Sequence, residues 1–351
     1  MKLNKNTAML CALLSALLYA ISIPFSKALL AQIPSTLLGA ILYLGAGAGC
    51  ALILPVQRRR NTEPKEARLK RRDFPVLLGM IGLDIAAVIL LLLGLAITNA
   101  SNASLLNNFE IVATSLVAVL IFREKLSRQI WLAVLLITVS CIILSFNGEG
   151  SFNFSLGSLL ILLGMACWGF ENNVTRLLSV NNPLEIVAFK GIGSGLGTLA
   201  IALCLNQATG NIVYILWGLA LGFCSYGLSL FFYILAQREL GAARTSAYCA
   251  ITPFIGAGLS FAVFRDMPTI AFAVALPIMI AAILFIAKEK HQHRHCHVAV
   301  THEHRHSHDD GHHSHTHAPP ALGEHSHMHT HEAVTHAHSH LFDVHHTHAH
   351  S

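Results

Sequence analysis

Four ionisable side chains lie inside long apolar stretches of this 351-residue chain: Asp84, Glu110, Glu171 and Lys190. A charged side chain at the centre of a membrane helix costs about 2.5–3.5 kcal/mol, so such residues mark pathways, proton relays or internal ion pairs. Asp84 and Glu110 stand near the middle of consecutive apolar segments. If they share one cavity, a carboxylate there can exchange a proton or bind a cation. The alternative is that Asp84 makes a local hydrogen bond and only Glu110 faces the cavity.

Glu171 and Lys190 have the opposite charges and similar depths. Each lies six or seven residues from the same end of neighbouring apolar segments, which at 1.5 Å per residue places both roughly 10 Å deep. The spacing predicts a structural ion pair, with a role in a cavity or gate as the alternative. Removing one partner would leave a buried charge unpaired.

Neutral polar and aromatic residues accompany these charges. Asparagines beside the two glutamates can hydrogen-bond a substrate or join helices; they are Asn107, Asn108, Asn172 and Asn173. Tyr19 and Trp168 can line the cavity or pack in its wall. The glycine runs at 45–49 and 191–197 favour close packing of helices over ligand contact.

The composition identifies the elements that must position these residues. The chain is 54% hydrophobic and only 12% charged, half the charged fraction of a typical soluble domain. Apolar segments long enough to cross about 30 Å of hydrocarbon as helices recur along the chain. We predict an all-α integral membrane protein with ten transmembrane helices, near residues 7–30, 34–55, 75–97, 101–122, 129–146, 156–178, 184–205, 212–235, 243–263 and 268–287.

Lysine and arginine predict the orientation of these spans. Eight of them lie in the single long loop, 57–73. The positively charged residues of the other loops on that side are far more numerous than on the opposite side, which keeps only Lys27 and Arg265. Because positive charge is enriched on the cytoplasmic side, we expect both termini in the cytoplasm and the chain in the inner or plasma membrane.

The two halves of the apolar region repeat each other. Tyr19, Lys27 and Pro34 match Trp168, Arg176 and Pro183 at a constant offset of 149 positions. A repeat of five spans must enter the membrane in opposite orientations, and inverted repeats are typical of transporters, with the substrate site near the midplane. We therefore divide the chain into a first five-helix repeat at 1–146, a second at 147–290 and a tail at 291–351.

Three local motifs extend this pattern: residues 103–110 (ASLLNNFE), residues 122–124 (FRE) and residues 168–173 (WGFENN). Together with the repeat they resemble the EamA-like family of the drug/metabolite transporter superfamily, over roughly residues 7–287. The resemblance implies a ten-helix carrier that works by alternating access from a central cavity. Glu110 stands where many relatives have proline, whereas the second half keeps Pro253 near the equivalent position. The tail is not part of the family pattern.

All 23 histidines lie between His291 and His350, and none occurs before them. The tail has little apolar surface to bury, so we expect it to be disordered without metal. Alternating His-x-His places imidazoles within reach of one Ni, Co, Zn or Cu ion; a pH-responsive polycation is the alternative. The predicted ligands are His291, His293, His295, His297, His302, His304, His306, His308, His312, His313, His315, His317, His325, His327, His329 and His331.

These observations predict a secondary carrier for a small metabolite or ion with a metal-binding cytosolic tail. Two alternatives stay open: a divalent transition-metal carrier, in which the tail collects the cargo, and a membrane-anchored metal store or sensor. The predicted spans contain no HExxH or GxSxG motif and the chain has no Walker motif, so we predict neither an enzyme nor an ATP-driven pump. We expect no required cofactor and no nucleic-acid partner; the partners are the lipid bilayer, the substrate and the tail's metal ions.

Overall fold

The computed structural model divides the chain into two compact units. One contains residues 1–289 with 342–351, and the other contains residues 290–341. The FRE motif at 122–124 lies outside the described residues. The described residues are 5–60, 73–121, 128–145, 155–175, 182–240, 248–249, 251–265, 268–287, 292–296, 300–306, 325–331 and 335–339.

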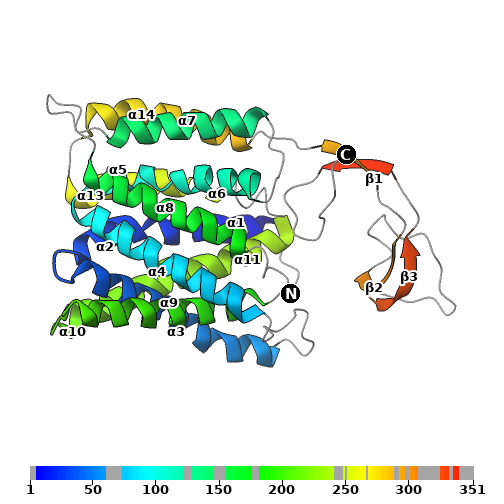
Figure 1. The fold of residues 1–351 in the computed structure, drawn as a ribbon, viewed down its shortest axis with the longest axis horizontal. Helices are drawn as coiled ribbons and strands as arrows, with labels where there is room; N and C mark the ends of the chain where they lie inside the picture. Colours follow the sequence, from blue (N-terminus) through cyan, green and yellow to red (C-terminus); the bar gives the residue numbers. More distant parts are fainter. Residues whose placement is uncertain are drawn as a thin grey trace. The chain divides into compact units, whose positions relative to one another are not determined.

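The first unit is a bundle of helices (Figure 1). Seven helical stretches in the described residues are long and apolar enough to cross a membrane. The three remaining segments predicted as spans also contain helices, at Leu156–Thr175, Thr252–Phe264 and Ile270–Ala287. The helices are α1 (Lys5–Ala20), α2 (Ser22–Leu29), α3 (Ser35–Arg60), α4 (Phe74–Ala96), α5 (Ala100–Leu106), α6 (Phe109–Leu120), α7 (Arg128–Ser145), α8 (Leu156–Thr175), α9 (Pro183–Cys204), α10 (Ile212–Gly222), α11 (Ser229–Leu240), α13 (Thr252–Phe264) and α14 (Ile270–Ala287).

Three of the predicted spans are interrupted rather than continuous. The first breaks at Ile21 between α1 and α2, and the eighth contains a π-helix, η3 (Phe223–Leu228), between α10 and α11. The fourth breaks at Asn107 and Asn108, where the backbone tightens into i→i+3 hydrogen bonds such as Asn108 N to Leu105 O. Irregular backbone at membrane depth is tolerated only where protein or a water-filled cavity surrounds it. These breaks therefore mark the interior of the bundle.

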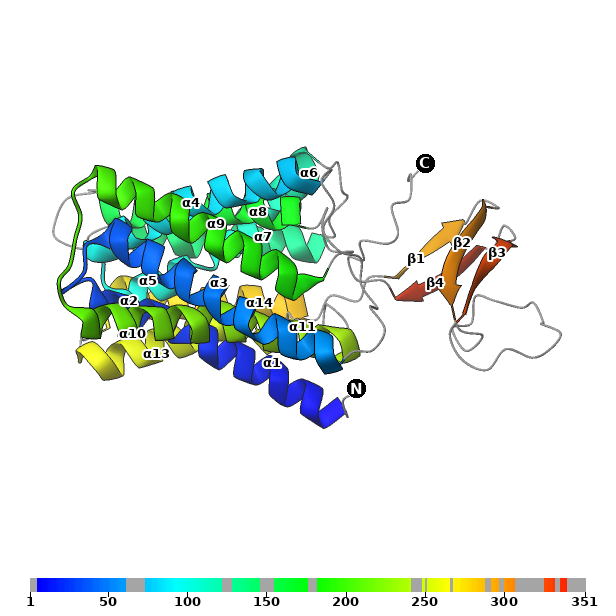
Figure 2. The same cartoon turned by 90° about the horizontal axis from the view of Figure 1, so that it is seen from below.

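Packing pairs segments from the two halves of the chain. Helices α3 and α9 run side by side (Figure 2), α7 packs on α14, and α5 packs on α13. The pairs α4–α8 and α1–α11 complete the main contacts. Large apolar side chains cover the outside, with Leu120, Trp217 and Ile270 between 65% and 85% exposed. Such a surface suits a lipid solvent.

Glycines explain how α3 and α9 approach so closely. A Cβ atom added to Gly191 would lie 2.7 Å from the Cα atom of Gly47, and one added to Gly195 would lie 2.7 Å from the Leu44 side chain. These distances are too short for any side chain larger than hydrogen. The prediction that the glycine runs serve helix packing is therefore confirmed for this pair of helices.

The second unit contains four short strands: β1 (Gln292–Cys296), β2 (Val300–His306), β3 (His325–His331) and β4 (Thr335–Ser339). They form two separate antiparallel pairs, β1 with β4 and β2 with β3. The expectation of a disordered tail is not met in these segments. Strict alternation of histidine with other residues has the two-residue period of a strand, and backbone pairing can use that period without an apolar core.

Candidate functional site

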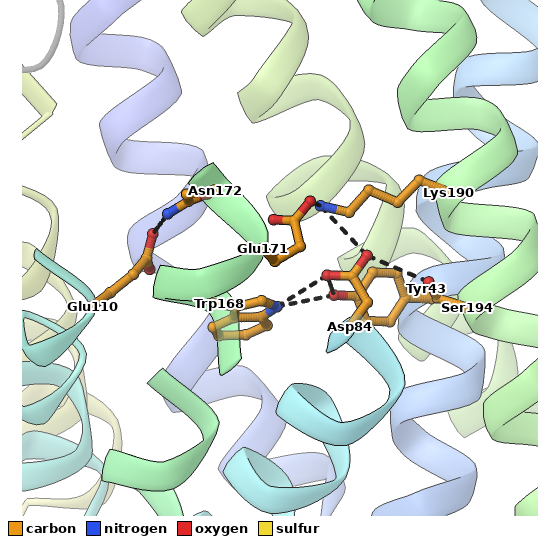
Figure 3. Close-up of polar contacts among 8 residues, drawn as sticks. All are labelled: Tyr43, Asp84, Glu110, Trp168, Glu171, Asn172, Lys190 and Ser194. Carbon is orange, nitrogen blue, oxygen red and sulfur yellow. Dashed lines mark hydrogen bonds and ion pairs between the residues drawn. The ribbon is translucent and has the colours of Figure 1, made fainter. Parts of the chain in front are cut away.

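Asp84 is the centre of a buried polar cluster in the helical unit (Figure 3). Its Oδ1 atom accepts hydrogen bonds from the Tyr43 hydroxyl at 2.9 Å and from the Trp168 indole N–H at 3.2 Å. Its Oδ2 atom accepts from the Ser194 hydroxyl at 3.3 Å. The Asp84 side chain is fully buried, and its partners come from three other helices, α3, α8 and α9.

Lys190 joins this cluster to a second carboxylate. Its Nζ atom lies 2.9 Å from Glu171 Oε1 and 3.3 Å from Asp84 Oδ2. The ion pair expected between Glu171 and Lys190 is therefore present. The contact with Asp84 was not expected, because the sequence does not show that α4 and α9 are neighbours.

The cluster is built to hold charge away from water. A buried carboxylate is tolerated when opposite charge and several hydrogen-bond donors surround it. Asp84 receives three neutral donors and one ammonium, so its lone pairs are occupied. Since Tyr43 and Asp84 belong to the first half of the chain and the other partners to the second, the cluster ties the two halves together.

Glu110 occupies a separate position on the far side of α8 (Figure 3). Its Oε1 atom accepts a hydrogen bond of 2.6 Å from the Asn172 side-chain amide. Glu171 and Asn172 are adjacent in sequence, so they point about 100° apart around the helix axis. One therefore reaches Lys190 and the other reaches Glu110. No contact between Asp84 and Glu110 occurs among the described side chains, so the two carboxylates do not form the directly shared pair that was considered.

An aromatic cluster lies beside Asp84. The Tyr226 ring of η3 lies 5.9 Å, between ring centroids, from the rings of Tyr19 and Tyr43 and 6.5 Å from that of Trp168. Tyr43 and Trp168 of this cluster are also the donors to Asp84 Oδ1. Tyr19 and Trp168, matched by sequence as equivalent positions of the repeat, thus meet through a third residue.

The other three asparagines fall into two kinds. Asn173 donates to the backbone oxygens of Thr114 and Gly169 at 3.1 and 2.9 Å, so it joins α8 to α6. Asn107 Oδ1 and Asn108 Nδ2, at the break between α5 and α6, are buried and have no hydrogen-bond partner among the described residues. A buried amide atom without a partner is costly, which makes this break a candidate contact for a polar ligand.

Three members of the site escaped prediction: Tyr43, Ser194 and Tyr226. Tyrosine and serine are common in membrane helices, so neither residue type stands out in an apolar run. The signal that was available is indirect. Ser194 lies four residues after Lys190 and therefore on the same face of α9.

Some of the predicted metal ligands of the tail lie in strands, and the others lie outside the described residues. Nine of the sixteen lie in strands, and His291, His297, His308, His312, His313, His315 and His317 lie outside the described residues. Among the side chains that are described, no three of His, Cys, Asp or Glu lie close enough to hold a metal ion together.

Comparison with known proteins accounts for the helical unit. The model of the EamA-like transporter family matches the chain twice, over residues 6–146 and 155–288. The chain belongs to the EamA-like transporter family. It is thus a multi-pass membrane protein of a transporter family, and two family domains follow one another in it.

Two curated relatives carry transporter names. A protein of Methanothermobacter thermautotrophicus described as an uncharacterized transporter is 28% identical over 268 residues, which cover 72% of this chain and 78% of that protein. The uncharacterized transporter YyaM of Bacillus subtilis is 22% identical over 210 residues, or 57% of this chain and 68% of its own length. A solved crystal structure shares the fold, with a TM-score of 0.58 at 16% identity, covering 80% of this chain and 95% of that one.

Proposed function

We propose that this transporter is a secondary-active carrier that moves a small metabolite or ion by alternating access. Glu110 is the carboxylate that exchanges a proton or binds a cationic group of the cargo. The His-rich tail faces the cytoplasm and binds a divalent transition metal.

The contrast between Asp84 and Glu110 carries the proposal. Asp84 is fully buried and has four donors around its two oxygens. Glu110 is only partly buried, and within the described residues Asn172 is its one hydrogen-bond donor. A carboxylate has about four positions that can accept a hydrogen bond. Those of Asp84 are occupied, whereas Glu110 can accept further hydrogen bonds from a ligand.

The charges of the site favour a positively charged occupant. Among the described residues Glu110 makes a hydrogen bond to the neutral amide of Asn172 and no ion pair, whereas Asp84 lies 3.3 Å from the Lys190 ammonium. Unbalanced charge in a low-dielectric interior is expensive and is relieved by protonation or by a bound cation. A proton and a cationic cargo would therefore compete for the same carboxylate.

The pattern of packing supports an inverted repeat. Exchanging the two halves of the chain leaves the pairs α3–α9 and α7–α14 in place, because each joins equivalent segments. The same exchange converts the α4–α8 pair into the α1–α11 pair. Such an arrangement lets one repeat rock against the other around a fixed central site.

A solute screen on proteoliposomes tests the proposal. Full-length protein, Glu110→Gln and a chain ending at Glu289 are compared for uptake of organic cations, zwitterions, neutral solutes and Ni, Co, Zn and Cu ions. We expect pH-dependent uptake of one solute class that Glu110→Gln abolishes, while the truncated chain and the control Asp73→Asn retain it. If the full-length protein moves no solute faster than Glu110→Gln does, the proposal is wrong.

A further inference from the structure

Histidine faces histidine in both strand pairs of the tail. In the β1–β4 pair, His293 is opposite His338 and His295 is opposite His336. In the β2–β3 pair the opposed residues are His302 and His329, His304 and His327, and His306 and His325. Every histidine of β1, β2 and β4 thus has a histidine as its cross-strand partner.

This register places the histidines on a common face of each pair. Residues directly opposite in an antiparallel pair have Cβ atoms about 4.5–5.5 Å apart, and residues two apart along a strand share a face. His293, His295, His336 and His338 therefore occupy four positions on one face of β1–β4, called a quartet below. The six histidines of β2–β3 contain an equivalent quartet and one additional cross-strand pair.

Because successive residues of a strand belong to opposite faces, the residues between the histidines lie on the other face of each pair. Arg294 and Cys296 occupy positions of the opposite parity in β1, as Glu303 and Arg305 do in β2. The quartet positions are thus all histidine and include no cysteine. Neutral imidazole suits Zn, Cu(II), Ni and Co rather than soft Cu(I).

We propose that each strand pair holds one borderline divalent transition-metal ion through a histidine quartet, and that the ion fixes the register of the pair. The inference rests on the proposed metal-binding tail and adds where the ions bind and how many the strands hold. Register is strongly specified where one face is buried and weakly specified in polar strands. A metal ion bound by two adjacent cross-strand histidine pairs fixes the register of the strands, as a buried apolar face does in other sheets. If the register slipped by one residue, no histidine would lie opposite another histidine.

Metal binding then couples to folding, because the ligands are brought together only in the paired strands. The topology is nested: β2–β3 lies within the chain segment that β1–β4 closes. Occupation of the inner pair shortens the loop that the outer pair must close, and a shorter loop costs less entropy to close. The two ions should therefore bind with positive cooperativity.

Permutation of histidines tests register separately from composition. The variant H327M/M328H/H331E/E332H keeps all 23 histidines of the chain but leaves no two histidines two positions apart in β3. The variant H338S/S339H does the same in β4. The exchange H348A/A349H, outside the strands, is the matched control. Full-length protein in detergent is dialysed against Zn or Ni, and the bound metal is counted by elemental analysis.

We expect each strand variant to bind one ion fewer than the wild-type chain, the combined variant to bind two fewer, and H348A/A349H to bind the same number. Unchanged metal content in the combined variant would overturn the proposal, because the tail would then act as a chelator that needs no register. If the wild-type chain binds no more metal than a chain ending at Glu289, the proposed metal-binding tail itself is wrong.

Discussion

Lys190 of the second half is ion-paired with Asp84 of the first half, with 3.3 Å between Nζ and Oδ2. The same ammonium lies 2.9 Å from Glu171 Oε1. One cation therefore contacts two buried carboxylates and links α4, α8 and α9.

Lys190→Met should destabilise the helical unit by about 3–5 kcal/mol, because two buried carboxylates lose their counter-ion. Adding Glu171→Gln should recover part of the loss. Lys27→Met is the matched control, since Lys27 donates to the neutral carbonyls of Leu95 and Ala96. Denaturant unfolding in detergent measures all three. Equal losses for Lys190→Met and Lys27→Met would show that the ion pairs contribute little.

Glu110→Gln should preserve the fold, and any uptake that remains should no longer depend on pH. The amide oxygen of glutamine can still accept the hydrogen bond from Asn172, whereas the proton-binding group is gone. Uptake measured from about pH 5 to pH 8 checks this expectation. A variant that keeps the wild-type pH profile would exclude Glu110 as the proton-exchanging group.

Gly191→Ala should cost about 1–3 kcal/mol, because its Cβ atom overpacks the contact between α9 and α3. Gly82→Ala is the control, since a Cβ atom there meets nothing within 4 Å. Removing a helical glycine in open space can instead stabilise by about 0.5–1 kcal/mol. Opposite signs in thermal unfolding are expected, and equal effects would contradict the close approach of the two helices.

Tyr226→Leu should lower transport about tenfold, whereas Tyr226→Phe should have a much smaller effect. Ring contacts contribute about 0.5–1.5 kcal/mol each, and 1.4 kcal/mol corresponds to a factor of ten. Phenylalanine keeps the three ring contacts and leucine removes them. If Tyr226→Phe loses as much as Tyr226→Leu, the hydroxyl and not the ring carries the effect.

Cys204 should react with an impermeant maleimide added from outside the cell. It is an exposed free cysteine at the end of α9, on the side opposite the termini by counting spans. A chain that keeps only Cys296, in the tail, should react only after the membrane is opened. The reverse pattern would place both termini outside.

The sequence was enough to predict the helices and part of the site. Apolar segments predict helices because the bilayer leaves few alternatives, and depth along neighbouring helices was enough to pair Glu171 with Lys190. It could not pair Lys190 with Asp84, since that contact depends on which distant helices become neighbours. The asparagines at 107–108 were noticed as polar residues, but nothing in the sequence showed that the helix breaks there.

The strands of the tail show a different limit. Low apolar content predicted that no structure persists, and this reasoning considered only burial as a source of stability. The two-residue period of histidine was visible in the sequence, but it was interpreted as ligand spacing alone. Which histidines oppose one another depends on the pairing of β1 with β4, and sequence alternation does not select between possible partners.

The π-helix at 223–228 has a consequence for how this chain should be aligned with others. A π-turn accommodates one residue more than an α-turn of the same rise, so η3 is the expected trace of a single-residue insertion. Each residue turns an α-helix by 100°, and a homologue without the extra residue would carry α11 rotated by that amount relative to α10. A sequence alignment that places the gap in a neighbouring loop would then miss a length change that lies within the helix. The residue equivalent to Tyr226 would be assigned to the wrong alignment column.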